Sequence, residues 1–164
     1  HYTTALYLEK CGILRQYFDR PALTTDVIVG FPGETEEEFA QTERFLETVH
    51  FSDMHIFKYS KRRGTKAADM PNQIDPQIQS VRSEKLIALG ERMKDDFLEA
   101  CKDQEQIVLI EEETEIDGTK YMTGHSKNYI RCAFEMDGLV PNMVIKGTIN
   151  SKLNEEFVFC KRID

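Results

Sequence analysis

The sequence predicts an α/β region followed by an all-β region, with a long helix between them. In the first half of the chain, helical and strand patterns alternate with short connections, which is the repeat of a parallel α/β sheet or barrel. From Gln104 onward the chain consists of short β-rich runs separated by turns, which is typical of a small β-barrel. The 164 residues, of which 40% are hydrophobic, suffice for one ordinary domain or two small ones.

The first half opens with a predicted helix and a predicted strand. Apolar residues recur at helical spacing between Thr3 and Phe18, and Thr3 and Thr4 are suitable caps. Pro21 interrupts this helix. Residues 23–29 end in a β-branched, apolar run, which suits a strand buried in a parallel sheet.

A glycine turn and a second helix follow this strand. Residues 30–33 read Gly-Phe-Pro-Gly, and Thr35 with Glu38 predicts a capping box at the start of the helix. The acids of this first turn favour the positive end of the helix. Residues 51–59 then predict a second strand. Two strands cannot close a barrel by themselves, so we expect part of a larger α/β structure.

Pro76 opens a long predicted helix that reaches Cys101 and carries an apolar stripe. We expect this helix to bridge two domains. Beyond it we expect a five-stranded OB-like β-barrel, a fold that often presents one face and its loops to single-stranded nucleic acid. The predicted strands are Ile107–Ile110, Tyr121–Gly124, Tyr129–Phe134, Met143–Ile149 and Phe157–Cys160.

Composition excludes several classes of protein. The formal net charge of −8 argues against binding nucleic acid by bulk electrostatics, so any RNA contact must use local patches. No apolar run approaches the ~20 residues of a membrane span, and no signal-peptide pattern is present, so we expect a cytoplasmic protein without a membrane partner.

The sequence predicts no metal site. The cysteines, Cys11, Cys101, Cys132 and Cys160, stand singly without a C-x-x-C pair, so we expect small buried side chains. The acid run 111–113 lies on a predicted strand, where successive side chains point to opposite faces, and we expect it to be solvated. His50 and His55 have no carboxylate or cysteine at ligand spacing.

The turn Gly30–Glu34 lies at the C-terminal end of a predicted strand, where parallel α/β folds bind ligands. Its glycines allow a close backbone approach. It is not a phosphate loop, because neither G-x-x-x-x-G-K-[ST] nor G-x-G-x-x-G is present. An ordinary turn before a well-capped helix explains the same spacing.

Two further segments are candidates for RNA contact. Residues 58–66 contain five cations and no acid, which suits a phosphate backbone, although a solvated basic loop is the alternative. Residues 124–131 group hydrogen-bonding, cationic and stackable side chains around a turn. Because residues 104–164 hold seven Lys/Arg against eleven Asp/Glu, this second site must be a confined patch, and a structural hairpin is equally compatible.

Three strings carry a resemblance to a known family. Residues 25–35, 59–65 and 67–71 resemble the MiaB-like radical-SAM methylthiotransferases. Residues 52–62 with Pro71-Asn72-Gln73 are most similar to the MtaB-type branch, which acts on N6-threonylcarbamoyladenosine beside the tRNA anticodon. Gly124-His125 and residues 128–131 resemble a TRAM domain, the RNA-binding module of these enzymes.

The resemblance implies a domain organisation and two sets of site residues. Residues 1–75 would form the C-terminal part of a (β/α)6 barrel, 76–103 a linking helix and 104–164 the TRAM domain. The implied contacts to S-adenosylmethionine are Asp26, Ile28, Gly30, Phe31, Phe57, Tyr59 and Ser60. The implied contacts to the tRNA anticodon stem-loop are Lys58, Lys61, Arg62, Arg63, His125, Asn128, Tyr129 and Arg131.

One departure from the family is decisive. These enzymes bind a [4Fe-4S] cluster through C-x-x-x-C-x-x-C and use a second [4Fe-4S] cluster, but neither cysteine set occurs here. We therefore expect no catalytic residue, no bound cofactor and no activity in this chain by itself. Since His1 is not an initiator Met, we expect the natural protein to begin upstream.

Two alternatives remain open at this point. The chain could be a stand-alone RNA-binding module whose α/β half is scaffold, or part of the related methylthiotransferase that acts on ribosomal protein S12. A C-x-x-x-C-x-x-C motif upstream would distinguish the enzyme from the module. Strand edges left exposed by an incomplete barrel could also cause self-association.

Overall fold

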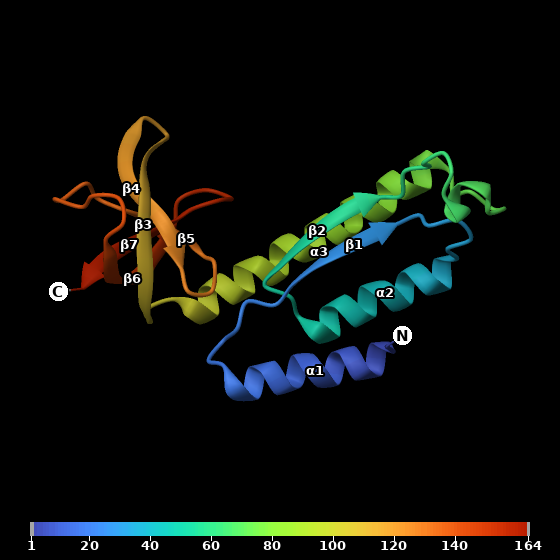
Figure 1. Cartoon of the computed structure of the whole chain (residues 1–164), viewed down its shortest axis with the longest axis horizontal. Coiled ribbons are helices and arrows are strands. Elements are labelled where there is room, and N and C mark those ends of the chain that lie inside the picture. The colour runs from blue at the N-terminus through green and yellow to red at the C-terminus, as the bar shows by residue number, and fades with distance from the viewer. Residues whose placement is uncertain (1, 164) are drawn as a thin grey trace. The chain divides into compact units, whose positions relative to one another are not determined.

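The computed structural model describes residues 2–163, which form two compact units that divide between Phe97 and Leu98. The first unit contains α1 (Thr4–Tyr17), β1 (Thr24–Val29), α2 (Glu36–Val49), β2 (Asp53–Lys58), the short 3-10 helix η1 (Lys66–Asp69) and most of α3 (Pro76–Cys101) (Figure 1). This order of helices and strands confirms the predicted α/β region.

The helices of the first unit begin where the sequence supplies caps. The Thr3 side chain accepts a hydrogen bond from the Leu6 amide at 3.2 Å. At α2, Thr35 Oγ1 accepts from the Glu38 amide at 3.2 Å, and Glu38 Oε2 accepts from the Thr35 amide at 2.8 Å. The Thr35 amide lowers the pKa of Glu38, because it stabilises the carboxylate. The predicted capping box is confirmed.

β1 and β2 form a parallel sheet with one covered and one open face. Val27, Val29 and Met54 are buried in a core shared with residues of α1, α2 and α3. On the other face, Ile28 and Phe57 are register partners that expose 55% and 52% of their surfaces. The prediction of a buried strand therefore holds for one face of β1, because successive side chains alternate between the two faces.

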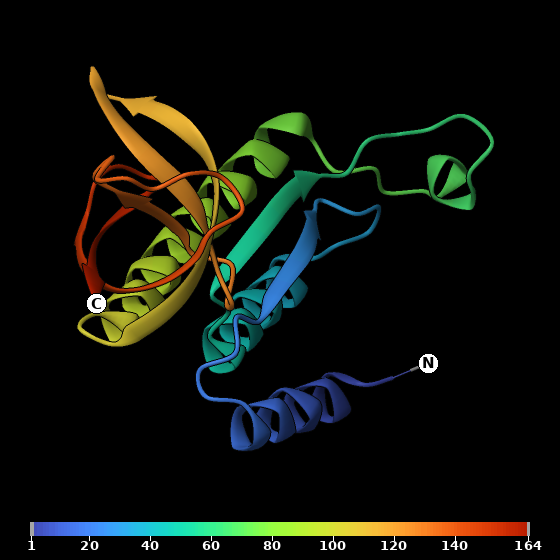
Figure 2. The same ribbon diagram turned by 60° about the vertical axis from the view of Figure 1, so that its left-hand side comes forward.

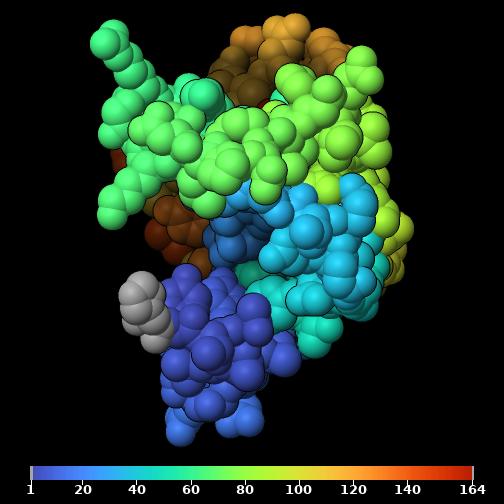
Figure 3. Space-filling view, turned by 90° about the vertical axis from the view of Figure 1, so that its right-hand side faces the viewer, coloured from blue at the N-terminus to red at the C-terminus, as the bar shows by residue number. Residues whose placement is uncertain are grey.

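The division between the units falls inside α3, near the end of the helix that we expected to link two domains. Leu86, Leu89 and Met93 of α3 belong to the core of the first unit. The middle of the apolar stripe predicted for this helix therefore packs in the core of this unit, whereas Ile78 and Val81 near its start are exposed. Between β2 and α3 the chain leaves the sheet as a protruding loop (Figures 2 and 3).

Within the described residues, the second unit is a closed barrel of five strands. They are β3 (Glu105–Ile116), β4 (Thr119–Ser126), β5 (Arg131–Phe134), β6 (Val144–Lys152) and β7 (Val158–Ile163), in the order β3-β4-β5-β7-β6. β5 and β7 pair in parallel, and the other pairs are antiparallel. The predicted five-stranded OB-like barrel is confirmed.

The third predicted strand of the barrel begins two residues too early. Tyr129 and Ile130 precede β5, because Tyr129 has a φ of 61° and so lies outside extended strand geometry. Its amide donates to the Ser126 carbonyl at 3.0 Å, which closes a turn between β4 and β5. This turn places Tyr129 on the surface beside β4.

Gly124 determines how closely β3 and β4 approach each other. A Cβ atom at this position would lie 1.8 Å from the Leu109 carbonyl oxygen. The strands also shift register between Ile110 and Glu112, as a β-bulge does. Any side chain at position 124 would therefore force these two strands apart.

All four cysteines are free and buried, as predicted. A hydrogen bond with Cys160, together with burial, raises the pKa of Cys132, so this thiol stays protonated. Among residues 2–163 no helix is long and apolar enough to cross a membrane. The same residues contain no group of three His, Cys, Asp or Glu side chains placed to hold a metal ion.

Candidate functional site

The open face of the parallel sheet gathers the residues predicted to bind a cofactor. Asp26 pairs in register with His55, and Ile28 pairs with Phe57, so these four side chains lie on the same face. Ile28 and Phe57 provide adjacent apolar surface near the C-terminal end of this face. A flat, exposed apolar pair with a carboxylate beside it suits a nucleoside: the ring packs on the hydrocarbon surface and a hydroxyl can donate to Asp26.

Phe31 and Tyr59 stand at the C-terminal edge of this face. Their ring centroids are 5.4 Å apart with an interplanar angle of 71°, an edge-to-face pair. The Tyr59 amide donates to the Val29 carbonyl at 2.9 Å. The Tyr59 hydroxyl is buried and has no hydrogen-bond partner among residues 2–163. Such a group costs about 1–3 kcal/mol when it stays unsatisfied, so a hydrogen-bond partner supplied by a ligand would be stabilising. Ser60 follows in an exposed position.

Gly30, also predicted to contact the cofactor, has both backbone groups engaged within the chain. Its amide donates to Glu34 Oε2 at 2.8 Å, and its carbonyl accepts from Gln79 Nε2 at 3.2 Å. A Cβ at Gly30 would lie 2.4 Å from Gln79 Cγ, and φ is 71°. The close backbone approach that this glycine allows is thus made by α3.

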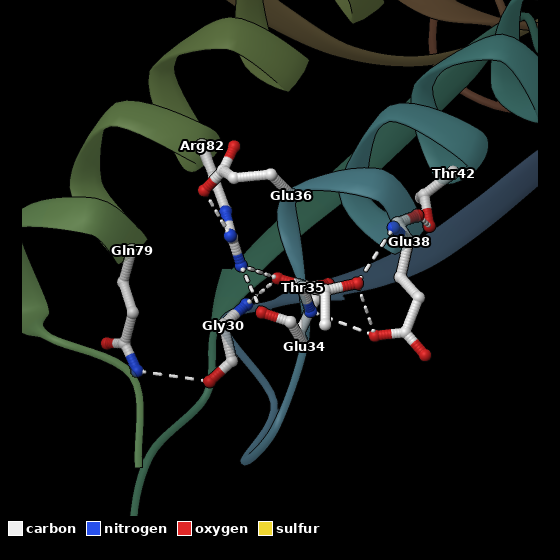
Figure 4. A network of polar contacts seen from close by, with 8 residues as sticks. All are labelled: Gly30, Glu34, Thr35, Glu36, Glu38, Thr42, Gln79 and Arg82. Carbon is white, nitrogen blue, oxygen red and sulfur yellow. Dashed lines mark hydrogen bonds and ion pairs between the residues drawn. The ribbon is translucent and has the colours of Figure 1, made fainter. Parts of the chain in front are cut away.

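A buried arginine of α3 holds the turn between β1 and α2 (Figure 4). Arg82 exposes 5% of its side chain; its Nη1 donates to Glu34 Oε2 at 2.6 Å and to the Glu34 carbonyl at 3.1 Å. Its Nη2 donates to Glu36 Oε1 at 2.5 Å. Burial alone would lower the pKa of Arg82, but the hydrogen bonds to Glu36 and Glu34 outweigh it and raise this pKa. The guanidinium therefore fixes the acidic turn below the open face.

Sequence reasoning missed Gln79 and Arg82. Both residues lie on one side of α3, three positions apart. The partners are separated by up to 49 positions along the chain, and no local pattern specifies such a pairing.

The segment Lys58–Lys66, here called the basic loop, carries five cations on the surface, from the last residue of β2 onward. Thr65 gives it shape: its hydroxyl donates to the Arg62 carbonyl at 2.8 Å and accepts from the Ala68 amide at 3.3 Å. Within residues 2–163 none of these cations forms an ion pair, although Lys58 Nζ lies 3.4 Å from Ser80 Oγ. Their full charge is therefore available to an anion.

The turn Gly30–Glu34 is connected to the segment that follows the basic loop. The Gly33 amide donates to the Asn72 carbonyl at 2.9 Å. The Gln73 side chain donates to the carbonyls of Ala67 and Met70 at 3.1 and 2.9 Å. The described structure thus places Gly30, Phe31, Tyr59 and Ser60 at the same end of the sheet as the basic loop, whereas Asp26 lies in the middle of β1.

In the barrel, His125, Tyr129 and Arg131 lie together on the outer surface. His125 Nδ1 is 2.7 Å from Glu111 Oε2, and the His125 and Tyr129 ring centroids are 5.5 Å apart. Arg131 forms an ion pair with Glu156, and its guanidinium lies 4.4 Å from the Phe157 ring centroid. Both cation-forming side chains therefore already have a carboxylate partner.

Asn128, which the sequence groups with these residues, makes contacts within the chain. Its Oδ1 accepts from Ser126 Oγ at 3.0 Å, and its Nδ2 lies 3.8 Å from Cys101 Sγ. These contacts hold the turn that carries Tyr129.

The acid run is exposed, as expected, but two of its members are also paired. Glu111 contacts His125 at 2.7 Å, and Glu113 contacts Lys120 at 2.6 Å.

Comparison with known proteins gives a consistent result. No family model matches the chain. The chain is 37% identical over 136 residues to the threonylcarbamoyladenosine tRNA methylthiotransferase MtaB of Bacillus subtilis, which covers 82% of the chain and 30% of that relative. It is 45% identical over 93 residues to the tRNA-2-methylthio-N(6)-dimethylallyladenosine synthase of Caldicellulosiruptor saccharolyticus, covering 57% of the chain and 20% of the relative.

A third relative extends the alignment to nearly the whole chain. The tRNA-2-methylthio-N(6)-dimethylallyladenosine synthase of Acetivibrio thermocellus is 33% identical over 150 residues, 92% of the chain and 31% of that protein. The chain thus spans less than a third of the length of the curated relatives it matches. Over that span, the chain belongs to the family of tRNA methylthiotransferases.

Proposed function

We propose that the protein containing this chain transfers a methylthio group to N6-threonylcarbamoyladenosine beside the anticodon of tRNA. The observation that carries this proposal is the alignment over 82% of the chain with a relative named for that substrate. The chain's own contribution would be one wall of the cofactor site and a grip on the tRNA.

The open face of β1 and β2 supports the cofactor part of the proposal. S-adenosylmethionine, when bound, supplies the activated methyl group and the adenosyl radical on which this family's reaction depends. Ile28 and Phe57 would pack against its adenine ring, and the Tyr59 hydroxyl would gain a hydrogen-bond partner. Asp26 and Ser60 would meet its polar groups at the two ends of the face.

The cysteines of this chain do not fit an iron–sulfur cluster. All four are buried, and none stands at the C-x-x-x-C-x-x-C spacing. The chain by itself should therefore not cleave S-adenosylmethionine under reducing conditions. Cleavage by the purified chain without any added protein would contradict this assignment.

The basic loop supports the tRNA part of the proposal. Its cations carry no ion pair within the described residues and lie near the C-terminal end of β2, beside the cofactor face. Cations in this state can replace the counterions of a phosphate backbone. An RNA held there would lie near the cofactor face, as transfer to a nucleoside requires.

Mass spectrometry of tRNA nucleosides tests the reaction. Cells lacking the gene should lose 2-methylthio-N6-threonylcarbamoyladenosine and accumulate N6-threonylcarbamoyladenosine, and the intact gene should restore the methylthio group. Loss of 2-methylthio-N6-dimethylallyladenosine instead would assign the substrate named for two of the relatives. Unchanged tRNA would contradict both assignments and favour a stand-alone RNA-binding module.

A further inference from the structure

We propose that the outer face of the barrel binds an unpaired RNA base by stacking, and that it makes little contact with phosphates. The surface consists of one transverse row of side chains and a tyrosine next to it, here called the stacking row: Val144, Leu109, His125, Arg131 and Tyr129. The inference rests on the proposed function in taking RNA as the ligand, and it specifies which part of the RNA this face recognises.

Strand register places the row on a single face. Leu109 is the register partner of Val144 on one side and of His125 on the other, and His125 is the partner of Arg131. Directly opposed residues of antiparallel strands point to the same side of a sheet. Val108 and Ile110, which flank Leu109 in sequence, are fully buried inside the barrel, so the row points outward.

The row combines planar groups with exposed apolar surface. Tyr129 is 82% exposed, and Val144 and Leu109 are 66% and 43% exposed. His125 is held at 2.7 Å by Glu111, and the guanidinium of Arg131 is held over the Phe157 ring at 4.4 Å. Unstacked RNA bases pack on aromatic rings and on guanidinium planes, and this row offers both with fixed orientations.

The carboxylates of Glu111 and Glu156 make the row more favourable for an RNA base than for a phosphate. A phosphate approaching His125 would also meet Glu111, and one approaching Arg131 would meet Glu156. Like charges at that range oppose binding, and displacing a carboxylate partner costs the interaction it made. A neutral ring meets no such opposition, so the local charge of the row is complementary to a base.

Equilibrium binding of the whole chain to an anticodon stem-loop RNA tests this inference. Tyr129→Ala should weaken binding roughly 5- to 150-fold, the range for losing one base–aromatic contact. The slope of log Kobs against log salt should stay unchanged, since no phosphate contact is lost. Tyr129→Phe keeps the ring and should bind like the unmodified chain. Tyr17→Ala removes a tyrosine that is equally exposed, at 80%, from α1 and should have no effect.

Changing the RNA gives the complementary measurement. Stem-loops in which single loop nucleotides are made abasic keep every phosphate, and one such replacement should reproduce the loss caused by Tyr129→Ala. With 2-aminopurine at that position, the unmodified chain should quench fluorescence and Tyr129→Ala should not. Abasic RNA that binds as well as intact RNA at every position would overturn the inference.

Two other results would also overturn it, and they can be told apart from failure of the proposed function. A Tyr129→Ala chain that binds normally but has a shallower salt slope would show a phosphate contact. Concentration-dependent mass that Tyr129→Ala abolishes would show that the row is an interface between copies of the chain. In both cases the tRNA nucleoside assay would still report the reaction, whereas unchanged nucleosides would contradict the proposed function itself.

Discussion

The basic loop and the stacking row contain similar residue types in opposite electrostatic states. The loop has five cations without an ion pair among the described residues, whereas the row's His125 and Arg131 each face a carboxylate. A cation can release counterions from a phosphate backbone only while its own charge is free. Counting Lys and Arg therefore predicts an RNA contact at both regions, whereas the ion pairs distinguish the free cations of the loop from the paired cations of the row.

The two regions are also held in place by different parts of the structure. The segment that follows the loop is joined to the turn Gly30–Glu34 by one hydrogen bond, from the Gly33 amide to the Asn72 carbonyl, and Arg82 holds that turn from α3. The row depends on strand register across β6, β3, β4 and β5, so its geometry belongs to the barrel backbone. A substitution can therefore disturb the contacts of one region without disturbing the other, because the chain divides into two compact units.

Arg82→Ala should have the largest effect, confined to the first unit. It leaves the Glu34 carboxylate, which is only 13% exposed, without its cation, and breaking a buried pair from one side costs about 3–5 kcal/mol. Urea unfolding should show the loss in the transition of the first unit, with protection of barrel amides from hydrogen exchange unchanged. Arg92→Ala is the matched control, since it removes an exposed pair with Glu47 worth about 0–1 kcal/mol. Equal losses for the two variants would refute the role given to Arg82.

Gly124→Ala should damage the row and spare the loop. The added Cβ would lie 1.8 Å from the Leu109 carbonyl oxygen, and overpacking of this kind costs about 1–3 kcal/mol or more. Because Leu109 and His125 face each other across this contact, the base-dependent part of RNA binding should fall. Gly12→Ala, where a Cβ would meet nothing within 4 Å in α1, is the control and should be neutral or stabilising. Retained quenching of 2-aminopurine by Gly124→Ala would show that the row tolerates a shift of β3.

Arg62→Ala combined with Arg63→Ala should change how RNA affinity depends on salt more than how it depends on the presence of a loop base. Each lost phosphate contact should make the slope of log Kobs against log salt shallower by about 0.7–0.9. The control is Arg44→Ala with Arg92→Ala, which removes the same charge from cations that are paired with Glu37 and Glu47. If both double variants change the slope equally, the loop has no specific part in RNA binding.

Local chemistry made most of the fold predictable. Thr35 and Glu38 specify the start of α2, and Pro76 specifies the start of α3. The short strands and frequent turns after Gln104 predict the small barrel. These signals act over a few residues, where capping and strand alternation are decided. The start of β5 was wrong because a positive φ at a non-glycine residue, Tyr129, has no dependable sequence signal.

The location of the candidate site residues could be predicted from the sequence, but whether their charged side chains form ion pairs could not. Ile28 and Phe57 could be placed at neighbouring strand ends, because parallel strands end at the same edge of a sheet. Arg82 could not be connected to Glu34, nor Arg131 to Glu156, because tertiary packing brings these residues together. Whether a cation is free or paired depends on such long-range contacts, and so does the ligand it can bind.

Glu156→Gln should have the smallest effect on binding. It tests directly whether the pairing of Arg131 is what keeps the row from binding phosphate as the loop is proposed to do. The amide keeps an oxygen that can accept from Arg131 but removes the charge, so the guanidinium, which stays protonated, becomes available to a phosphate. The salt slope should become steeper by up to about 0.7–0.9, because the row would gain one phosphate contact. Glu135→Gln removes the same charge from an exposed acid after β5 and should leave the slope nearly unchanged. A slope that stays constant in Glu156→Gln would mean that no phosphate lies within reach of the row. The loop and the row would then differ in the position of their cations relative to the RNA backbone as well as in the pairing of those cations.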